Sequence, residues 1–193
     1  LVGLDLPPPA RRHQVIPYAL SQAQQGRSPD ASLGLDARYA LTPQTSAYAT
    51  LNPDFATIEA DQEEINLTRF ELNLTEKRQF FIEGQELFRQ RIRTFYSRRI
   101  GDISGGAKVL GTQGGWSFAA LSTQGDLQGS SDGANYTVAR VRRDVASRSN
   151  IGFLLANRSH EGRNRWAVEI DANLFFTQLF GFTGQFVKSY GAF

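Results

Sequence analysis

The sequence predicts an all-β chain: an antiparallel transmembrane β-barrel, or part of one, with one non-strand insert. The first observation is composition, because 18 glycines, 14 phenylalanines and 6 tyrosines without a run of 18 apolar residues favour strands over a membrane-spanning helix. The second is that apolar and polar residues alternate with a period of two in many short runs. The third is length, since the best runs approach the ~9–11 residues that a tilted strand needs to cross a bilayer.

Charge and composition restrict the function classes. Lys and Arg number 21 and Asp and Glu 19, a net charge of +2, so we expect no nucleic-acid partner. A mean hydropathy of -0.36 is compatible with a barrel, because the lumen-facing half of each strand is polar. Cysteine is absent, which excludes disulfides, thiolate metal ligands and cysteine nucleophiles. The chain has no Met and starts at Leu1, so we expect it to be a segment of a longer product.

Residues 1–12 are predicted to be a linker. Pro7, Pro8 and Pro9 follow one another, and consecutive prolines favour an extended chain over a helix or a central strand. We place the boundary near Arg12 and assign residues 13–193 to the β-barrel segment.

The clearest early strand is the run 32–41. Leu33, Leu35 and Tyr39 lie on one side, and Asp36 and Arg38 lie on the other. A Thr-Pro-Gln turn then leads into the run 46–52, so the two runs form a predicted hairpin.

The clearest late strand is the run 165–174, where an apolar face again stands opposite a polar one. We expect the apolar side chains of these two strands to face lipid: Leu33, Leu35, Tyr39, Trp166, Val168 and Ile170. Weaker or shorter candidates bring the total to roughly ten strands. They are 14–22, 67–74, 93–99, 107–112, 116–123, 135–142, 150–157 and 181–190.

The insert is predicted over residues 56–91, where the alternation stops and a short helix is expected at 83–91. Its stretch TEKRQFFIEG puts a charge cluster beside large hydrophobic side chains, which neither a soluble core nor a solvated loop favours. Either the segment folds into the lumen as a plug, or it is an exposed loop with an amphipathic turn. The candidate plug residues are Glu76, Lys77, Arg78, Phe80, Phe81 and Glu83. As a plug, Lys77 and Arg78 would contact carboxylates on neighbouring strands.

Other polar residues give a basic patch but no catalytic or metal site. Arg98, Arg99, Arg140 and Arg142 are the candidates for a basic patch in the lumen or at its rim. The acidic residues of 54–64 lack the calcium-loop pattern, and closeness in sequence does not set two carboxylates across a sugar. His13 and His160 are far apart in sequence. We therefore assign no catalytic, cofactor or metal residue and expect no enzyme.

Several short motifs carry a family resemblance. They are Asn52-Pro53-Asp54-Phe55, Glu59-Ala60-Asp61, Asn66-Leu67, Phe70-Glu71, Glu76-Lys77-Arg78, Phe80-Phe81, Glu83-Gly84 and Ser97-Arg98-Arg99-Ile100-Gly101. Through them the chain resembles, from about Leu33 to Asn157, a family of bacterial outer-membrane proteins of unassigned function. In that family a carbohydrate-binding-module-like sandwich of the family-nine type precedes a large β-barrel. The resemblance implies the start of the barrel region and offers no catalytic residues to transfer.

These observations together predict the function. We expect an outer-membrane β-barrel protein that transports a polymer such as a glycan, or binds one at the surface, with no cofactor. Its partners would be outer-membrane lipid, a glycan or other polymer, and another protein if the barrel belongs to a larger assembly. A soluble β-sandwich carbohydrate-binding module remains the alternative.

Overall fold

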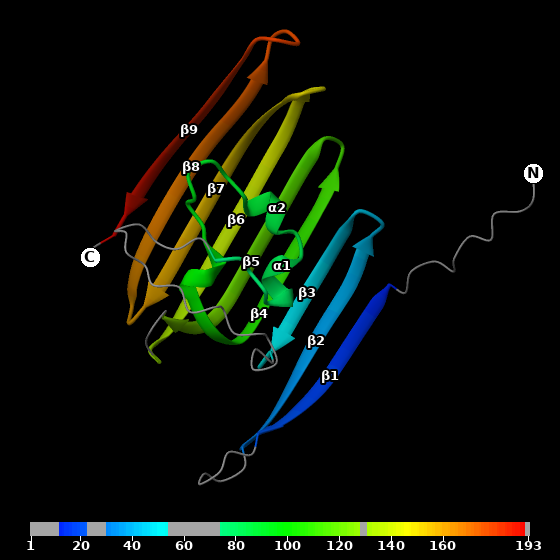
Figure 1. Cartoon of the computed structure of the whole chain (residues 1–193), viewed down its shortest axis with the longest axis vertical. Helices are drawn as coiled ribbons and strands as arrows, with labels where there is room; N and C mark the ends of the chain where they lie inside the picture. The colour runs from blue at the N-terminus through cyan, green and yellow to red at the C-terminus, as the bar shows by residue number, and fades with distance from the viewer. Residues whose placement is uncertain (1–11, 23–29, 54–73, 128–130, 192–193) are drawn as a thin grey trace, which may run out of the picture.

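One antiparallel sheet of nine strands, in chain order, forms the protein (Figure 1). The computed structural model describes residues 12–22, 30–53, 74–127 and 131–191. The strands are β1 (His13–Gln22), β2 (Asp30–Thr42), β3 (Thr45–Leu51), β4 (Ile100–Gln113), β5 (Trp116–Leu127), β6 (Gly133–Ala146), β7 (Ser149–His160), β8 (Arg163–Phe175) and β9 (Gly181–Tyr190). The predicted all-β class is confirmed, and the sheet is open over the described residues.

The predicted strands are mostly present, and several are longer than the alternation indicates. β4 begins at Ile100 rather than at Ala107: Gly105 and Gly106 interrupt the apolar pattern, but both pair with β5, and the strand continues back to Ile100 through register shifts. The run 93–99 is not a strand: it is irregular chain that ends in a short 3-10 helix, η1 (Ser97–Arg99). Most of the candidate strand 67–74 lies outside the described residues, as does the first part of the predicted insert.

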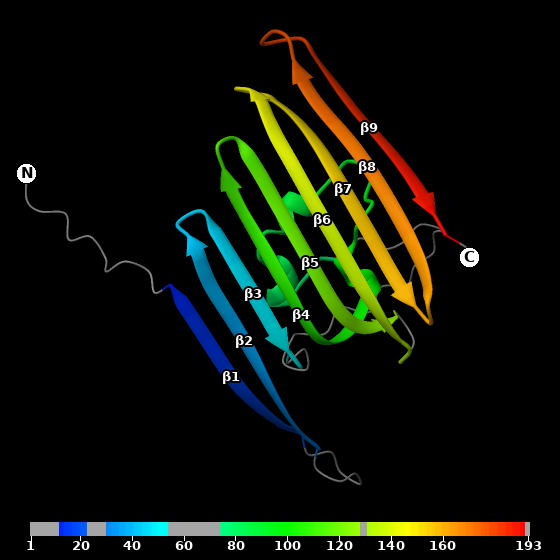
Figure 2. The same ribbon diagram turned by 180° about the vertical axis from the view of Figure 1, so that it is seen from behind.

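The insert separates β3 from β4, which nevertheless pair side by side in the sheet. It contains the one-turn helices α1 (Gln79–Ile82) and α2 (Gln85–Phe88). Both lie on the same face of the sheet, in front of it in Figure 1 and behind it in Figure 2. We call this the insert face and the opposite side the open face.

The strand register divides side chains between the two faces. Across β3, β4 and β5, Tyr48 stands opposite Lys108 and Lys108 opposite Leu121, all on the insert face. The open face carries most of the large exposed hydrophobic side chains. They include Val15, Leu33, Tyr39, Leu51, Trp116, Val141, Ile151, Phe153, Trp166, Ile170, Phe182, Phe186 and Tyr190.

The buried core lies between the insert and the sheet. One cluster contains Phe80, Phe81, Ile100, Ile103, Ala134 and Tyr136. The second contains Phe88, Ala119, Leu121, Val138 and Leu154. The insert thus supplies the large aromatic side chains that cover the centre of the insert face.

In the described part of the chain, no helix is long and apolar enough to cross a membrane.

Candidate functional site

The two helices of the insert are joined at Gly84, which adopts the left-handed conformation with φ 72°. A Cβ at this position would also collide with Leu110 of β4, so glycine is needed both for the turn and for the close approach to the sheet. The turn lets Phe80 and Phe81 of α1 and Phe88 of α2 all point into the core. The rings of Phe80 and Phe81 meet edge to face with centroids 5.2 Å apart.

A buried ion pair holds the segment that precedes α1. The guanidinium of Arg78 donates to both carboxylate oxygens of Glu76 and to the carbonyl oxygens of Ile100 and Ser97, all at 2.8 Å. The two side chains are only 7% and 5% exposed. Burial by itself would raise the pKa of Glu76, but the hydrogen bonds and the charge of Arg78 hold that pKa below its ordinary value.

This arrangement corrects the expected pairing. In the described part of the chain, Arg78 forms its ion pair with Glu76 of the same segment, and its contacts with β4 are made to backbone carbonyls. Glu76 and Arg78 are only two residues apart, so they can pair without help from the sheet. The buried charge of Arg78 is therefore compensated within its own segment.

Lys108, in the middle of β4, fixes α1 to the sheet. Its ammonium donates to the carbonyl oxygen of Phe80 and, at 2.5 Å, to that of Glu83. The hydroxyl of Tyr48 donates to Glu83 Oε2 at 3.4 Å, so β3 contacts the same turn. Lys108 was not among the residues predicted from the sequence. The sequence held one signal for it. Lys108 is a cation between the apolar residues Ala107 and Val109, so the alternation puts it on the polar face of the strand, which is the insert face.

The chain after α2 is attached to the far strands of the sheet. Gln185 of β9 accepts from the backbone nitrogen of Ile92 at 2.6 Å and donates to the carbonyl of the same residue at 2.8 Å. The side-chain amide of Gln90, in its hydrogen-bonding orientation, donates to Glu169 Oε2 at 3.2 Å. The insert therefore extends from β3 and β4 at one side to β8 and β9 at the other.

Arg140 lies in this far region as a buried and compensated charge. It forms an ion pair with Asp171 and lies 4.0 Å from Glu169, which is fully buried. The pair with Asp171 crosses β7 over Gly152, where a Cβ would lie 2.6 Å from the Asp171 carboxylate. Sequence analysis missed the role of this glycine, because the alternation does not indicate which strands neighbour each other.

The four arginines predicted as one basic patch do not come together. Arg98 and Arg99 lie in η1, which leads into the end of the sheet where Ile100 pairs with Leu127. Arg142 of β6 stands opposite Ser117 of β5 in the strand register, near the opposite end of the sheet. It lies 3.9 Å from Asp144. The strand length between these ends separates the two pairs of arginines.

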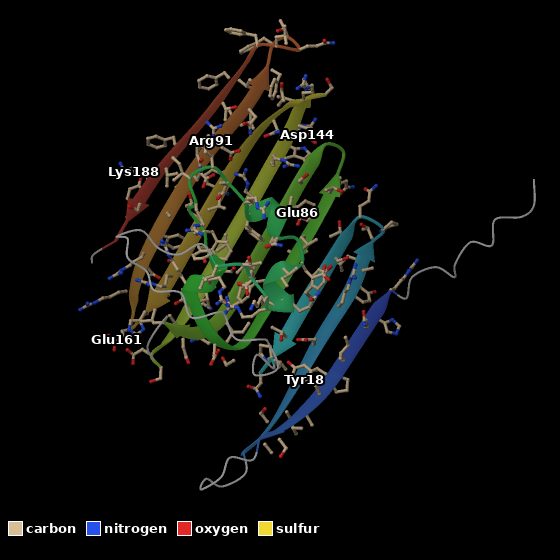
Figure 3. The ribbon with its side chains drawn as sticks, in the orientation of Figure 1. Tyr18, Glu86, Arg91, Asp144, Glu161 and Lys188 are labelled. Carbon is tan, nitrogen blue, oxygen red and sulfur yellow. The ribbon has the colours of Figure 1, made fainter. Side chains whose placement is uncertain are left out.

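A cavity of about 790 Å³ opens beside the insert. Arg89, Arg91 and Arg93 contribute to its lining, together with aromatic side chains that include Phe95 and Tyr96. The guanidinium of Arg93 lies over the Tyr96 ring at 3.9 Å. Figure 3 labels Arg91 on the part of the insert that crosses in front of the sheet.

The remaining predicted residues are placed as follows. Glu76, Arg78, Phe80 and Phe81 are buried, whereas Lys77 and Glu83 are half-buried. The acidic candidates Asp54, Glu59, Asp61, Glu63 and Glu64 lie outside the described residues. His13 is in β1 and His160 ends β7. Among the residues that the structure describes, no three His, Cys, Asp or Glu side chains are grouped so as to hold a metal ion.

A family model described as "Domain of unknown function (DUF5916)" matches residues 8–113, which include β1 to β4 and the insert. No match is found among curated proteins or among solved structures.

Proposed function

The chain belongs to the family described as "Domain of unknown function (DUF5916)", and we propose that its sheet is part of the wall of a β-barrel in the bacterial outer membrane. In this proposal the open face contacts lipid and the insert lies in the lumen. The protein transports a polymer such as a glycan, or binds it at the surface, without catalysing a reaction.

The observation that carries the proposal is the opposite character of the two faces. On the open face Leu33 is 75% exposed, Phe186 64% and Ile170 52%. Soluble monomers rarely expose a continuous apolar surface of more than a few hundred Å². A bilayer would cover such a face, as it covers the outside of every membrane barrel.

The charged and aromatic side chains of the open face support a membrane orientation. Arg143 and Lys188 lie toward strand ends on this face, over the rings of Trp116 and Tyr190, each at 5.1 Å. Aromatic side chains near both ends of an apolar band are typical of the two membrane interfaces. Long cationic side chains there can extend to the headgroups.

The length of the apolar stretch on β8 also fits a strand that crosses a membrane. On β8 the apolar open-face residues extend from Trp166 to Leu174, which is about 27 Å along a strand. At a tilt of ~40° this length corresponds to roughly 21 Å along the membrane normal, close to the ~25 Å apolar band of outer-membrane barrels.

The alternative, a soluble β-sandwich module, fits less well. A sandwich buries the apolar face of its sheet against a second sheet. Here the insert covers the more polar face, and the described residues leave the apolar face uncovered.

The absence of native cysteine allows a direct experiment on the facing of the strands. Single variants Ala37→Cys and Phe153→Cys on the open face, and Ser46→Cys and Ser189→Cys on the insert face, would each carry a fluorescent label. With the chain reconstituted into vesicles that contain spin-labelled lipid, we expect strong quenching at the open-face positions and weak quenching at the insert-face positions. Equal quenching on the two faces, or none on either, would exclude a lipid-facing wall.

A further inference from the structure

The chain directly after α2 places three arginines along one cavity. Arg89, Arg91 and Arg93 alternate with Gln90 and Ile92 in a non-helical segment. Gln90 and Ile92 make the contacts with Glu169 and Gln185 described above, which anchor the segment to the sheet. With the segment held in this way, all three arginines line the same cavity of about 790 Å³, and Gln90 lines it with them.

The cavity has an excess of positive charge. Among the described residues that line it, Arg89, Arg91, Arg93 and Lys108 are basic, although the whole chain is nearly balanced in charge. Glu76 is the acidic side chain among the described lining residues, and it is paired with Arg78. The guanidiniums of Arg89 and Arg91 are exposed and have no hydrogen-bond or ion-pair partner within the described part of the chain.

We propose that this cavity binds the carboxylate or sulfate groups of an acidic polysaccharide. The inference rests on the function proposed above and names the class of polymer. A guanidinium donates two parallel hydrogen bonds to a carboxylate or sulfate, which gives both charge and geometry to the recognition. Gln85, Thr75 and Ser97 also line the cavity and can hydrogen-bond to sugar hydroxyls. The volume is within the ~300–1,000 Å³ of ordinary ligand sites.

The same lining argues against a nucleic acid. Single-stranded nucleic acids bind by stacking bases on free aromatic faces. Phe81 and Phe88 are buried in the core, Phe95 packs against the Phe88 ring, and one face of Tyr96 is occupied by Arg93. The cavity thus offers mainly cations and amides, and its aromatic rings are largely engaged in contacts with other side chains.

The test measures polymer binding by isothermal titration calorimetry of the full chain in detergent micelles. Dextran sulfate and polygalacturonate provide sulfate and carboxylate groups, and neutral dextran, polyglutamate and an oligothymidylate are the comparison polymers. The variant is Arg89→Gln with Arg91→Gln. The matched control is Arg148→Gln with Arg163→Gln, which removes the same charge from exposed arginines outside the cavity. Circular dichroism checks that both variants are folded.

We expect the wild-type chain to bind at least one acidic polysaccharide and not neutral dextran. The cavity variant should bind it at least ~10-fold more weakly, because two charge-assisted contacts are lost, and the control should change it less than about twofold. Equal weakening in the control, or no binding of either acidic polysaccharide, would overturn the inference. Tighter binding of polyglutamate or oligothymidylate would overturn the polymer class. Lipid quenching of the labelled open face is a separate measurement, so a chain that inserts into vesicles but binds no acidic polysaccharide refutes this inference alone.

Discussion

Arg78 donates from Nε and Nη2 to the two carboxylate oxygens of Glu76, each at 2.8 Å, within the hydrophobic contact between the insert and the sheet. The guanidinium also lies over the ring of Phe81 at 4.4 Å. This relationship explains why TEKRQFFIEG combines charges with large hydrophobic residues. Glu76 and Arg78 neutralise each other, Arg78 also donates hydrogen bonds to backbone carbonyls, and the aromatic rings fill the core.

Arg78→Ala should strongly destabilise the docked insert. The substitution leaves the Glu76 carboxylate buried without a partner, which costs ~3–5 kcal/mol where burial is deep. Urea unfolding in detergent micelles measures the loss. Lys77→Ala is the matched control, because Lys77 is only half-buried, and it should cost much less. Similar losses for the two variants would show that the buried pair is not what holds the segment.

Acid should weaken the same contact. The folded pKa of Glu76 lies below its ordinary value of 4.5, so the folded state favours the carboxylate. The resulting stability is fully present above about pH 4.5 and is lost as the pH falls through the folded pKa. Urea midpoints of wild type and Glu76→Gln between pH 7 and pH 3 should therefore converge at low pH. A difference between the two chains that does not depend on pH would contradict the assignment.

Gln185→Ala should release the chain after α2 from the sheet. Both hydrogen bonds to the backbone of Ile92 are lost, and three trypsin sites, Arg89, Arg91 and Arg93, lie next to the released segment. We expect trypsin to cleave there several times faster than in the wild type. Thr183→Ala, two residues earlier in β9, serves as the control and should leave the cleavage rate unchanged.

An arginine on the open face should be costly in lipid. Leu35→Arg and Val168→Arg are each expected to lose ~2–4 kcal/mol near the bilayer midplane, measured by urea refolding into vesicles. Ser189→Arg on the insert face is the control and should lose little. Glu169, next to Val168, is unsuitable as a control, because it is fully buried on the insert face. Equal losses at Val168 and Ser189 would argue against a lipid-facing open face.

Phe80→Ala with Phe81→Ala should loosen the insert. Two buried rings leave the core, and each truncation typically costs ~3–5 kcal/mol when considered alone. In planar bilayers containing the full-length protein, we expect a higher conductance or more open-state noise, because a mobile insert would obstruct the lumen less. Ile92→Ala, at an exposed side chain of the same insert, is the control. Wild-type conductance in the double variant would exclude a plug.

Long-range contacts account for most of what sequence analysis missed. The alternation predicted a run that overlaps each of the nine strands, with β4 too short, and it gave the apolar faces of β2 and β8. It failed at 93–99, where apparent strand residues such as Phe95 and Tyr96 instead anchor irregular chain by side-chain contacts. It could not identify Lys108, Gly152 or Gln185 as members of the site, because each of them contacts residues that are distant in the chain.

The sequence by itself determined which side chains share a face, because a period of two depends only on local backbone geometry. It therefore separated Leu35 from Asp36 and Val168 from Glu169 before any pairing was known. Only the tertiary structure decided which strands are neighbours, and thus that Arg140 meets Asp171 across β7 and that Arg98 lies far from Arg142. It also decided the partner of Arg78. Register and docking depend on contacts between distant segments, and a local pattern of polarity does not specify them.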